Sequence, residues 1–242
     1  MKKAVIVLSA CVLILTSSCE TLNQTAQILT QAGANPTSAE IAAGLKQALE
    51  YGTANSSEKL SSRGGYLENL AVKLLFPPEA QKVERTLRTL GLNKLCDNVI
   101  ISLNRAAEDA ATEAKPIFLS AIKQMTIADA TNILLGNQSD AATKYFQRVT
   151  TNQLEAKFNP IIQNSLSKVG ATRYWSDVIT RYNQIPLVSK INPDLDEYVT
   201  QKAIEGLFFE IAQEELRIRQ NVAARKTDLL KKVFGYADRS KG

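Results

Sequence analysis

The stretch DLDEYVTQKAIEGLFFEIAQEELRIRQ, residues 194–220, has the pattern of one long amphipathic helix. Asp194, followed three residues later by Glu197, is typical of a capping box, which marks a helix start. A helix of this length with an apolar stripe buries that stripe against other helices, so the stretch predicts a helical bundle. The apolar residues that recur every three or four positions are Ile204, Leu207, Phe208, Ile211 and Ile218.

Helix signals recur along the rest of the chain, whereas strand patterns are nearly absent. Thr126 with Asp129 forms a second capping box, and Gly136 is a typical stop for the helix that follows it. We therefore predict an all-α fold, a multi-helix bundle with short connections, preceded by a signal peptide and a tether. Residues 37–242 are expected to form a single helical domain.

Three places interrupt this regular pattern. Pro116 breaks or kinks the helical segment that begins near Leu92. The last helix, TDLLKKVFG at residues 227–235, is predicted to end on its terminal glycine, Gly235. The segment GGYLENLAVKLLFPP, residues 64–78, fits either an irregular loop or one short extended piece, and the sequence leaves both open.

The composition excludes several classes of function. The 242 residues carry 29 basic and 24 acidic side chains, and the formal charge of +5 is too small to indicate nucleic-acid binding. Histidine is absent, which excludes Ser-His and Cys-His catalysis and removes the commonest metal ligand. No phosphate-binding glycine loop or calcium-binding spacing occurs, so we expect no cofactor and no metal.

Residues 1–18 have the layout of a bacterial export signal. Two lysines precede an apolar run over residues 4–15, and small hydroxyl residues follow it. The sequence ILTSSC, residues 14–19, resembles the lipobox of bacterial lipoproteins, which implies that Cys19 is acylated and begins the mature chain. The alternative is an ordinary secretory signal cleaved near Ser18, but an unpaired cysteine is a poor choice in an oxidising compartment.

A lipid-anchored protein of this kind would carry residues 19–36 as a lipidated N-terminus and tether. No later apolar run approaches the roughly 20 residues needed to span a bilayer. Glu20, in place of the aspartate associated with retention at the inner membrane, favours the outer membrane facing the periplasm. We expect contact with the membrane through the lipid and with a protein partner of the cell envelope, and no contact with nucleic acid.

Five segments carry a resemblance to a known family, and they occur in that family's order. They are NRAAEDA (104–110), MTIADATNILLG (125–136), AATKYF (141–146), EGLFFEIAQEELRIR (205–219) and TDLLKKVFG (227–235). Together they resemble a family of uncharacterised bacterial lipoproteins, classed as a domain of unknown function, over nearly the whole mature chain. Val222 stands where that family has a proline. The resemblance implies an exported helical domain and carries over no catalytic residue.

Glu215 is the polar residue that most needs an explanation, because it falls in the middle of an apolar stripe. An unpaired carboxylate at such a position is costly, so we expect it to meet a cation. Arg219 is one turn away, and Arg105 is a candidate partner from another helix. A structural ion pair is the simpler interpretation, and the alternative is a general acid or base in an apolar cleft.

A second group of polar residues lies on another predicted helix. Asn104 and Glu108, four residues apart, fall between apolar faces and must be hydrogen-bonded to be tolerated there. Arg105 and Asp109 form a second four-apart pair on the adjoining flank. Cys96 lies on the apolar face of the same helix, which favours a small buried residue over a reactive thiol.

These observations lead to three hypotheses of function. The preferred one is a lipid-anchored helical module of the cell envelope that acts through binding or assembly and without catalysis. The first alternative is an envelope hydrolase in which Glu215 and either Asn104 or Glu108 surround a water, and it requires these side chains to converge on an open pocket. The second alternative is a carrier of a lipid or another apolar ligand, which requires a continuous apolar cavity between helices.

Overall fold

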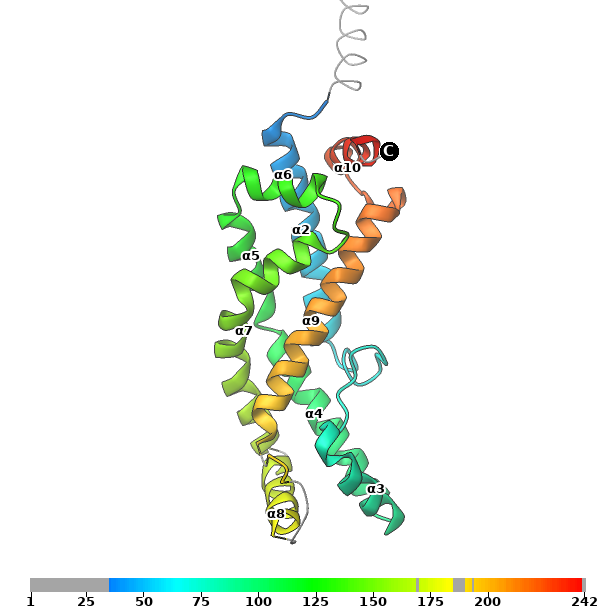
Figure 1. The fold of residues 1–242 in the computed structure, drawn as a ribbon, viewed down its shortest axis with the longest axis vertical. Helices are drawn as coiled ribbons and strands as arrows, with labels where there is room; N and C mark the ends of the chain where they lie inside the picture. The colour runs from blue at the N-terminus through cyan, green and yellow to red at the C-terminus, as the bar shows by residue number, and fades with distance from the viewer. Residues whose placement is uncertain (1–34, 169, 185–189, 193, 241–242) are drawn as a thin grey trace, which may run out of the picture. The chain divides into compact units, whose positions relative to one another are not determined.

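The computed structural model describes residues 35–168, 170–184, 190–192 and 194–240 (Figure 1). The predictions for the export signal and for Cys19 lie outside the described residues, as does most of the tether. The described residues from Ser38 onward form one compact unit.

The described residues are mostly helical and contain no β-strand, so the predicted all-α fold class is confirmed. None of the described helices combines the length and the apolar character that a membrane span requires. In chain order the elements are α2 (Ser38–Ser61), the 3₁₀ turn η1 (Pro78–Ala80), α3 (Gln81–Thr89), α4 (Asn93–Ala111), α5 (Ala114–Gln124), α6 (Ile127–Leu135), α7 (Ala141–Lys168), α8 (Ala171–Asn183), α9 (Leu195–Gln220), the 3₁₀ turn η2 (Val222–Ala224) and α10 (Asp228–Ser240).

The core lies between the long helices α2, α4, α7 and α9. Helix α7 packs along both α9 and α4, and α2 packs against α9 (Figure 1). All five residues of the apolar stripe predicted for α9 are buried. Phe118 of α5 meets Phe146 of α7 and Phe208 of α9 edge to face, with ring centroids 5.1 and 6.1 Å apart.

The local start signals act largely as the sequence predicts. Thr126 and Asp129 form the capping box of α6, with reciprocal hydrogen bonds of 3.1 Å between each side chain and the other residue's backbone N–H. Asp194 caps α9 as well. Its carboxylate accepts from the backbone N–H of Asp196 at 2.8 Å, however, and not from that of Glu197 as in the predicted capping box. Pro116 lies in the first turn of α5, where a missing N–H costs nothing, and α4 has already ended.

The predicted end of the last helix at Gly235 is wrong, because α10 continues through that glycine to Ser240. The apolar face extends past the glycine, and the buried Ala237 packs in the core. A glycine inside a helix costs only about 1 kcal/mol relative to alanine, so burial of the next turn outweighs it.

The ambiguous segment proves to be irregular. Residues 62–77 follow α2 as a series of turns and form neither helix nor strand. We call residues 62–77 the anchored loop, because buried side chains of α4 hold its backbone and α9 holds two of its side chains.

Candidate functional site

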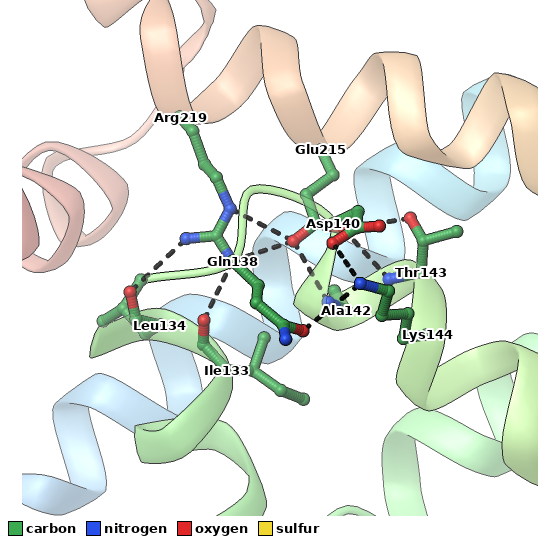
Figure 2. Close-up of polar contacts among 9 residues, drawn as sticks. All are labelled: Ile133, Leu134, Gln138, Asp140, Ala142, Thr143, Lys144, Glu215 and Arg219. Carbon is green, nitrogen blue, oxygen red and sulfur yellow. Dashed lines mark hydrogen bonds and ion pairs between the residues drawn. The ribbon is translucent and has the colours of Figure 1, made fainter. Parts of the chain in front are cut away.

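Glu215 is a buried carboxylate of α9 that caps the start of α7 (Figure 2). Its Oε2 accepts hydrogen bonds from the backbone N–H and from the hydroxyl of Thr143, both at 2.9 Å. Its Oε1 accepts from the backbone N–H of Ala142 at 3.0 Å. The N–H groups of a first helical turn have no partner inside their own helix, so Glu215 satisfies two of them and meets the positive end of the α7 dipole.

Arg219 completes this arrangement on the other side of the same carboxylate. Its guanidinium donates to Glu215 Oε1 at 2.8 and 3.1 Å. It also donates to the backbone carbonyls of Ile133 at 2.9 Å and Leu134 at 3.3 Å, in the last turn of α6 (Figure 2). Glu215 and Arg219, with side chains 5% and 11% exposed, therefore join the end of α6 to the start of α7. We call this pair the helix-end clamp.

The surroundings of the clamp leave no room for a substrate. The cavity beside Glu215 has a volume of about 20 Å³, which holds about one water molecule. Among the residues that the structure describes, no hydrogen bond or ion pair links Glu215 to Asn104, Glu108 or Arg105. The cation that Glu215 meets is Arg219. The three side chains of the hydrolase hypothesis therefore do not share a site.

Glu108 is buried on α4 and holds the first part of the anchored loop. Its Oε1 accepts hydrogen bonds from three backbone N–H groups of the loop, that of Gly64 at 3.1 Å and those of Tyr66 and Leu67 at 3.3 Å. Its Oε2 accepts from the guanidinium of Arg105. Three N–H donors and a cation compensate the burial of this carboxylate, which would otherwise be costly.

Asn104, one turn earlier on α4, holds the last part of the anchored loop. Its side-chain oxygen accepts from the backbone N–H of Leu74 at 2.9 Å, and its amide nitrogen donates to the carbonyl of Leu74 at 2.8 Å. The same nitrogen also donates to the carbonyl of Ile100 at 2.7 Å. Asn104 thus pairs with both backbone groups of one loop residue, as a neighbouring strand would.

Helix α9 holds the loop from the opposite side. The buried hydroxyl of Tyr66 donates to the carbonyl of Ala203 at 2.7 Å. The close approach depends on Gly206, where a Cβ atom would lie 2.8 Å from the Tyr66 ring. Asn69 donates to the buried Glu210 at 2.7 Å, and that carboxylate also pairs with a lysine of α2. The irregular loop is therefore fixed between two helices.

The fixed loop and α9 border an open groove with a volume of about 440 Å³. Its lining is mainly apolar and includes Val72, Leu74, Phe76, Tyr198, Gly206 and Phe209. Leu75 and Phe209 remain exposed at its edges, and Leu70 on the same loop is 89% exposed. Exposed apolar side chains that border a concave surface are typical of a binding site.

Charged groups at the groove are few. Lys202 pairs with Glu205 at 2.5 Å on α9. Lys73 lines the groove from the loop and forms no ion pair within the described part of the chain. Tyr198 donates its hydroxyl to the carbonyl of Leu75 at 3.0 Å. Burial, followed by the charges of two nearby glutamates, raises the pKa of Tyr198 to about 12, so the hydroxyl stays a donor at neutral pH.

The remaining candidate residues are Asp109, Arg105 and Cys96. Asp109 accepts a hydrogen bond from Ser165 at 2.6 Å, whereas Arg105 pairs with Glu108. Cys96 is a free, fully buried cysteine, and burial raises the pKa of its thiol, which keeps it protonated and unreactive. Within the described residues, no cluster of acidic or cysteine side chains is arranged to hold a metal ion.

Sequence reasoning identified Asn104 and Glu108, two of the residues that hold the loop, but neither Glu210 nor the groove that the loop forms. Lys73, Leu75 and Phe209 lie on two segments that are distant in the sequence, and no short motif connects them. The available signal was the ambiguity of residues 64–78, since a long irregular segment in a helical domain is usually functional.

Comparison with models of protein families gives a match over most of the chain. A family model described as a protein of unknown function (DUF4197) matches residues 35–235, from just before α2 into α10. No curated protein and no solved structure matches the sequence. The matched region includes the helix-end clamp, the anchored loop and the groove.

Proposed function

We propose that this chain, which belongs to the DUF4197 family of unknown function, is a lipid-anchored binding module of the cell envelope. Its groove beside the anchored loop receives an extended segment of a partner protein. The observation that carries this proposal is the fixation of an irregular loop by Asn104, Glu108 and Glu210, three buried polar side chains.

The length and fixation of the loop support a role beyond connecting two helices. Connections between helices in bundles usually span about 2–8 residues, and longer irregular connections are mostly functional. Residues 62–77 are longer than that, yet buried hydrogen bonds hold them at both ends. A rigid loop on a helical scaffold presents a surface of constant shape, which lowers the entropic cost of binding.

The chemistry of the groove indicates the kind of segment that fits. Its floor and edges are apolar, so the partner should contribute apolar side chains. Lys73 carries a positive charge without an ion-pair partner in the described chain, so the partner should also offer an aspartate or glutamate. A volume of about 440 Å³ suits a few side chains of an extended segment.

The two alternative functions have less support. The hydrolase hypothesis has neither a substrate pocket at Glu215 nor a convergence of Glu215 with Asn104 or Glu108. The carrier hypothesis needs a continuous apolar cavity, whereas the apolar cavity between Cys96 and Trp175 measures about 20 Å³. That volume holds about one water molecule and is far too small for an acyl chain, which occupies roughly several hundred cubic ångströms.

We further propose that Cys19 carries the lipid, in the outer membrane and facing the periplasm. The lipobox-like sequence before it supports this assignment. A tether from residue 20 to residue 36 reaches about 50 Å when extended, at about 3.3 Å per residue. Cells fed a radioactive fatty acid should label the protein, and Cys19→Ala should abolish the label. Unchanged labelling of that variant would refute the lipid anchor.

The groove is tested by photo-crosslinking in cells. A photoreactive amino acid placed at Phe209 should crosslink one envelope protein, and the same group at Val149, an exposed apolar position on α7, should not. Lys73→Glu should reduce the crosslink because it repels the expected acidic residue. The crosslinked peptide, sequenced by mass spectrometry, should contain apolar residues next to an aspartate or glutamate.

Two results would contradict the groove proposal. One is equal crosslinking from Phe209 and Val149, which would indicate random collisions. The other is a crosslink from Phe209 that Lys73→Glu leaves unchanged. The lipid-labelling experiment is independent of both, so the anchor and the groove can fail separately.

A further inference from the structure

The turn between α3 and α4 exposes a cluster of leucines. Leu90, Leu92 and Leu95 are 69%, 43% and 36% exposed and surround Gly91 at the apex of the turn. Gly91 has a φ of +81°, and nothing lies within 4 Å of the position its Cβ would occupy. We call these three leucines the apolar tip. Apolar side chains gathered in this way at a protruding turn usually contact something outside the chain.

The apolar tip lies at one end of the helical unit. Figure 1 shows α3 and the start of α4 as a helical hairpin at the end opposite to α6 and α10. Helix α3 packs mainly against α4 and η1, and Val83 is its one buried residue. Leu90 and Leu92 are the more exposed leucines of the tip, and Leu95 also borders a small apolar cavity beside Trp175 of α8.

The hairpin around the tip is basic. Its positive side chains are Lys82, Arg85, Arg88 and Lys94. The two acidic side chains between residues 81 and 97 are Glu84 and Asp97, and both bond to Arg88, at 2.9 and 3.0 Å. The other three cations form no ion pair within the part of the chain described here. Arg85 and Lys94 lie within roughly 9 Å of the apex along their helices.

We infer that the apolar tip inserts into the interface of an anionic lipid surface. The leucines enter the boundary between headgroups and acyl chains, and the surrounding cations meet the lipid phosphates. A convex apex with an apolar centre and a basic surround complements a flat anionic surface, whereas a protein partner would need a pocket shaped around the turn. The inference concerns a surface separate from the groove and does not rest on the proposed function.

Fluorescence quenching in vesicles tests this inference with the full-length chain. A cysteine introduced at the exposed Asn93, next to the tip, carries an environment-sensitive label in a Cys11→Ser, Cys19→Ser background. The matched control carries the label at Val222, an exposed position that lies after α9. Cys96 is fully buried and does not compete for the label. Vesicles contain quencher-bearing lipid in either phosphatidylglycerol or phosphatidylcholine.

The label at position 93 should shift to the blue and lose most of its emission in phosphatidylglycerol vesicles, but not in phosphatidylcholine. The emission of the label at position 222 should change in neither kind of vesicle, even where the N-terminal apolar segment holds the chain on the vesicle. Leu90→Ser with Leu92→Ser, and separately Arg85→Gln with Lys94→Gln, should each remove most of the quenching at position 93.

Other outcomes overturn the inference. Absence of quenching at position 93 in phosphatidylglycerol would show that the tip does not insert. Equal quenching in the two kinds of vesicle would contradict the role of the cations. Equal quenching at positions 93 and 222 would show that the whole unit lies on the lipid without using the tip.

Discussion

The helix-end clamp and the anchored loop are held by the same kind of hydrogen bonding but differ in what they form. In both, a buried carboxylate accepts hydrogen bonds from backbone N–H groups and from an arginine: Glu215 from the first turn of α7, Glu108 from the irregular backbone after α2. The clamp joins two regular helices and lies beside a cavity of about one water. The anchored loop borders an open groove, and two leucines of the loop are exposed. A buried carboxylate therefore does not indicate catalysis by itself. Its role depends on whether the segment that it holds lies in the core or forms an open surface.

Loss of the clamp carboxylate should have the largest effect on stability. Glu215→Ala leaves the nearly buried Arg219 without its anion and two α7 N–H groups without acceptors, so it should cost about 3–5 kcal/mol. The midpoint of thermal unfolding should fall by roughly 10 °C. The control is Glu214→Ala, since Glu214 pairs with the more exposed Arg217 and should cost less than about 1 kcal/mol. Similar urea unfolding curves for the two variants would contradict the clamp.

Loss of the loop carboxylate should cost less stability but change the loop more. Glu108→Ala leaves three loop N–H groups without their acceptor and should cost about 2–4 kcal/mol. Trypsin should then cut after Arg63 and Lys73 faster than in the wild type, whereas Glu215→Ala should leave these sites comparatively protected. Asp109→Ala is the control on the same helix, because Asp109 is exposed and its carboxylate accepts a hydrogen bond from Ser165 rather than from the loop. Equal cleavage in Glu108→Ala and Asp109→Ala would count against the anchoring role.

The smallest effect is expected at Tyr66, whose hydroxyl forms one buried hydrogen bond to α9. Tyr66→Phe should cost about 1 kcal/mol at neutral pH. Burial, and then the charges of Glu210 and Glu108, raises the pKa of Tyr66 well above its usual value. Below about pH 10 both folded and unfolded chains keep the proton, and above it the unfolded chain loses the proton first, so stability falls as pH rises. Denaturation at pH 9 and 11 should show a smaller fall for Tyr66→Phe, and an equal fall would contradict this account.

The helical class and the main helix were predictable because they depend on local patterns. The period of apolar residues identified α9, and the position of Glu215 within that stripe identified a residue that needs a partner. Arg219 was foreseeable as well, since it lies one turn away on the same helix. These predictions required only the geometry of a single helix.

The partners from other elements were not predictable. Glu215 bonds to Ala142 and Thr143, more than seventy positions away in the sequence, and no local pattern encodes that contact. Arg105 and Glu108 lie three residues apart on one helix, but the loop N–H groups that share the Glu108 carboxylate come from another segment. The groove escaped detection for the same reason: its shape depends on tertiary hydrogen bonds to a segment without periodicity.

Hydrogen exchange of the backbone amides tests most directly the claim that buried side chains fix the anchored loop. In the wild-type protein, the amides of Gly64, Tyr66, Leu67 and Leu74 should exchange as slowly as those in the middle of α4, because Glu108 and Asn104 accept their hydrogen bonds. Fast exchange of these four amides, at the rate of an unstructured loop, would contradict the account.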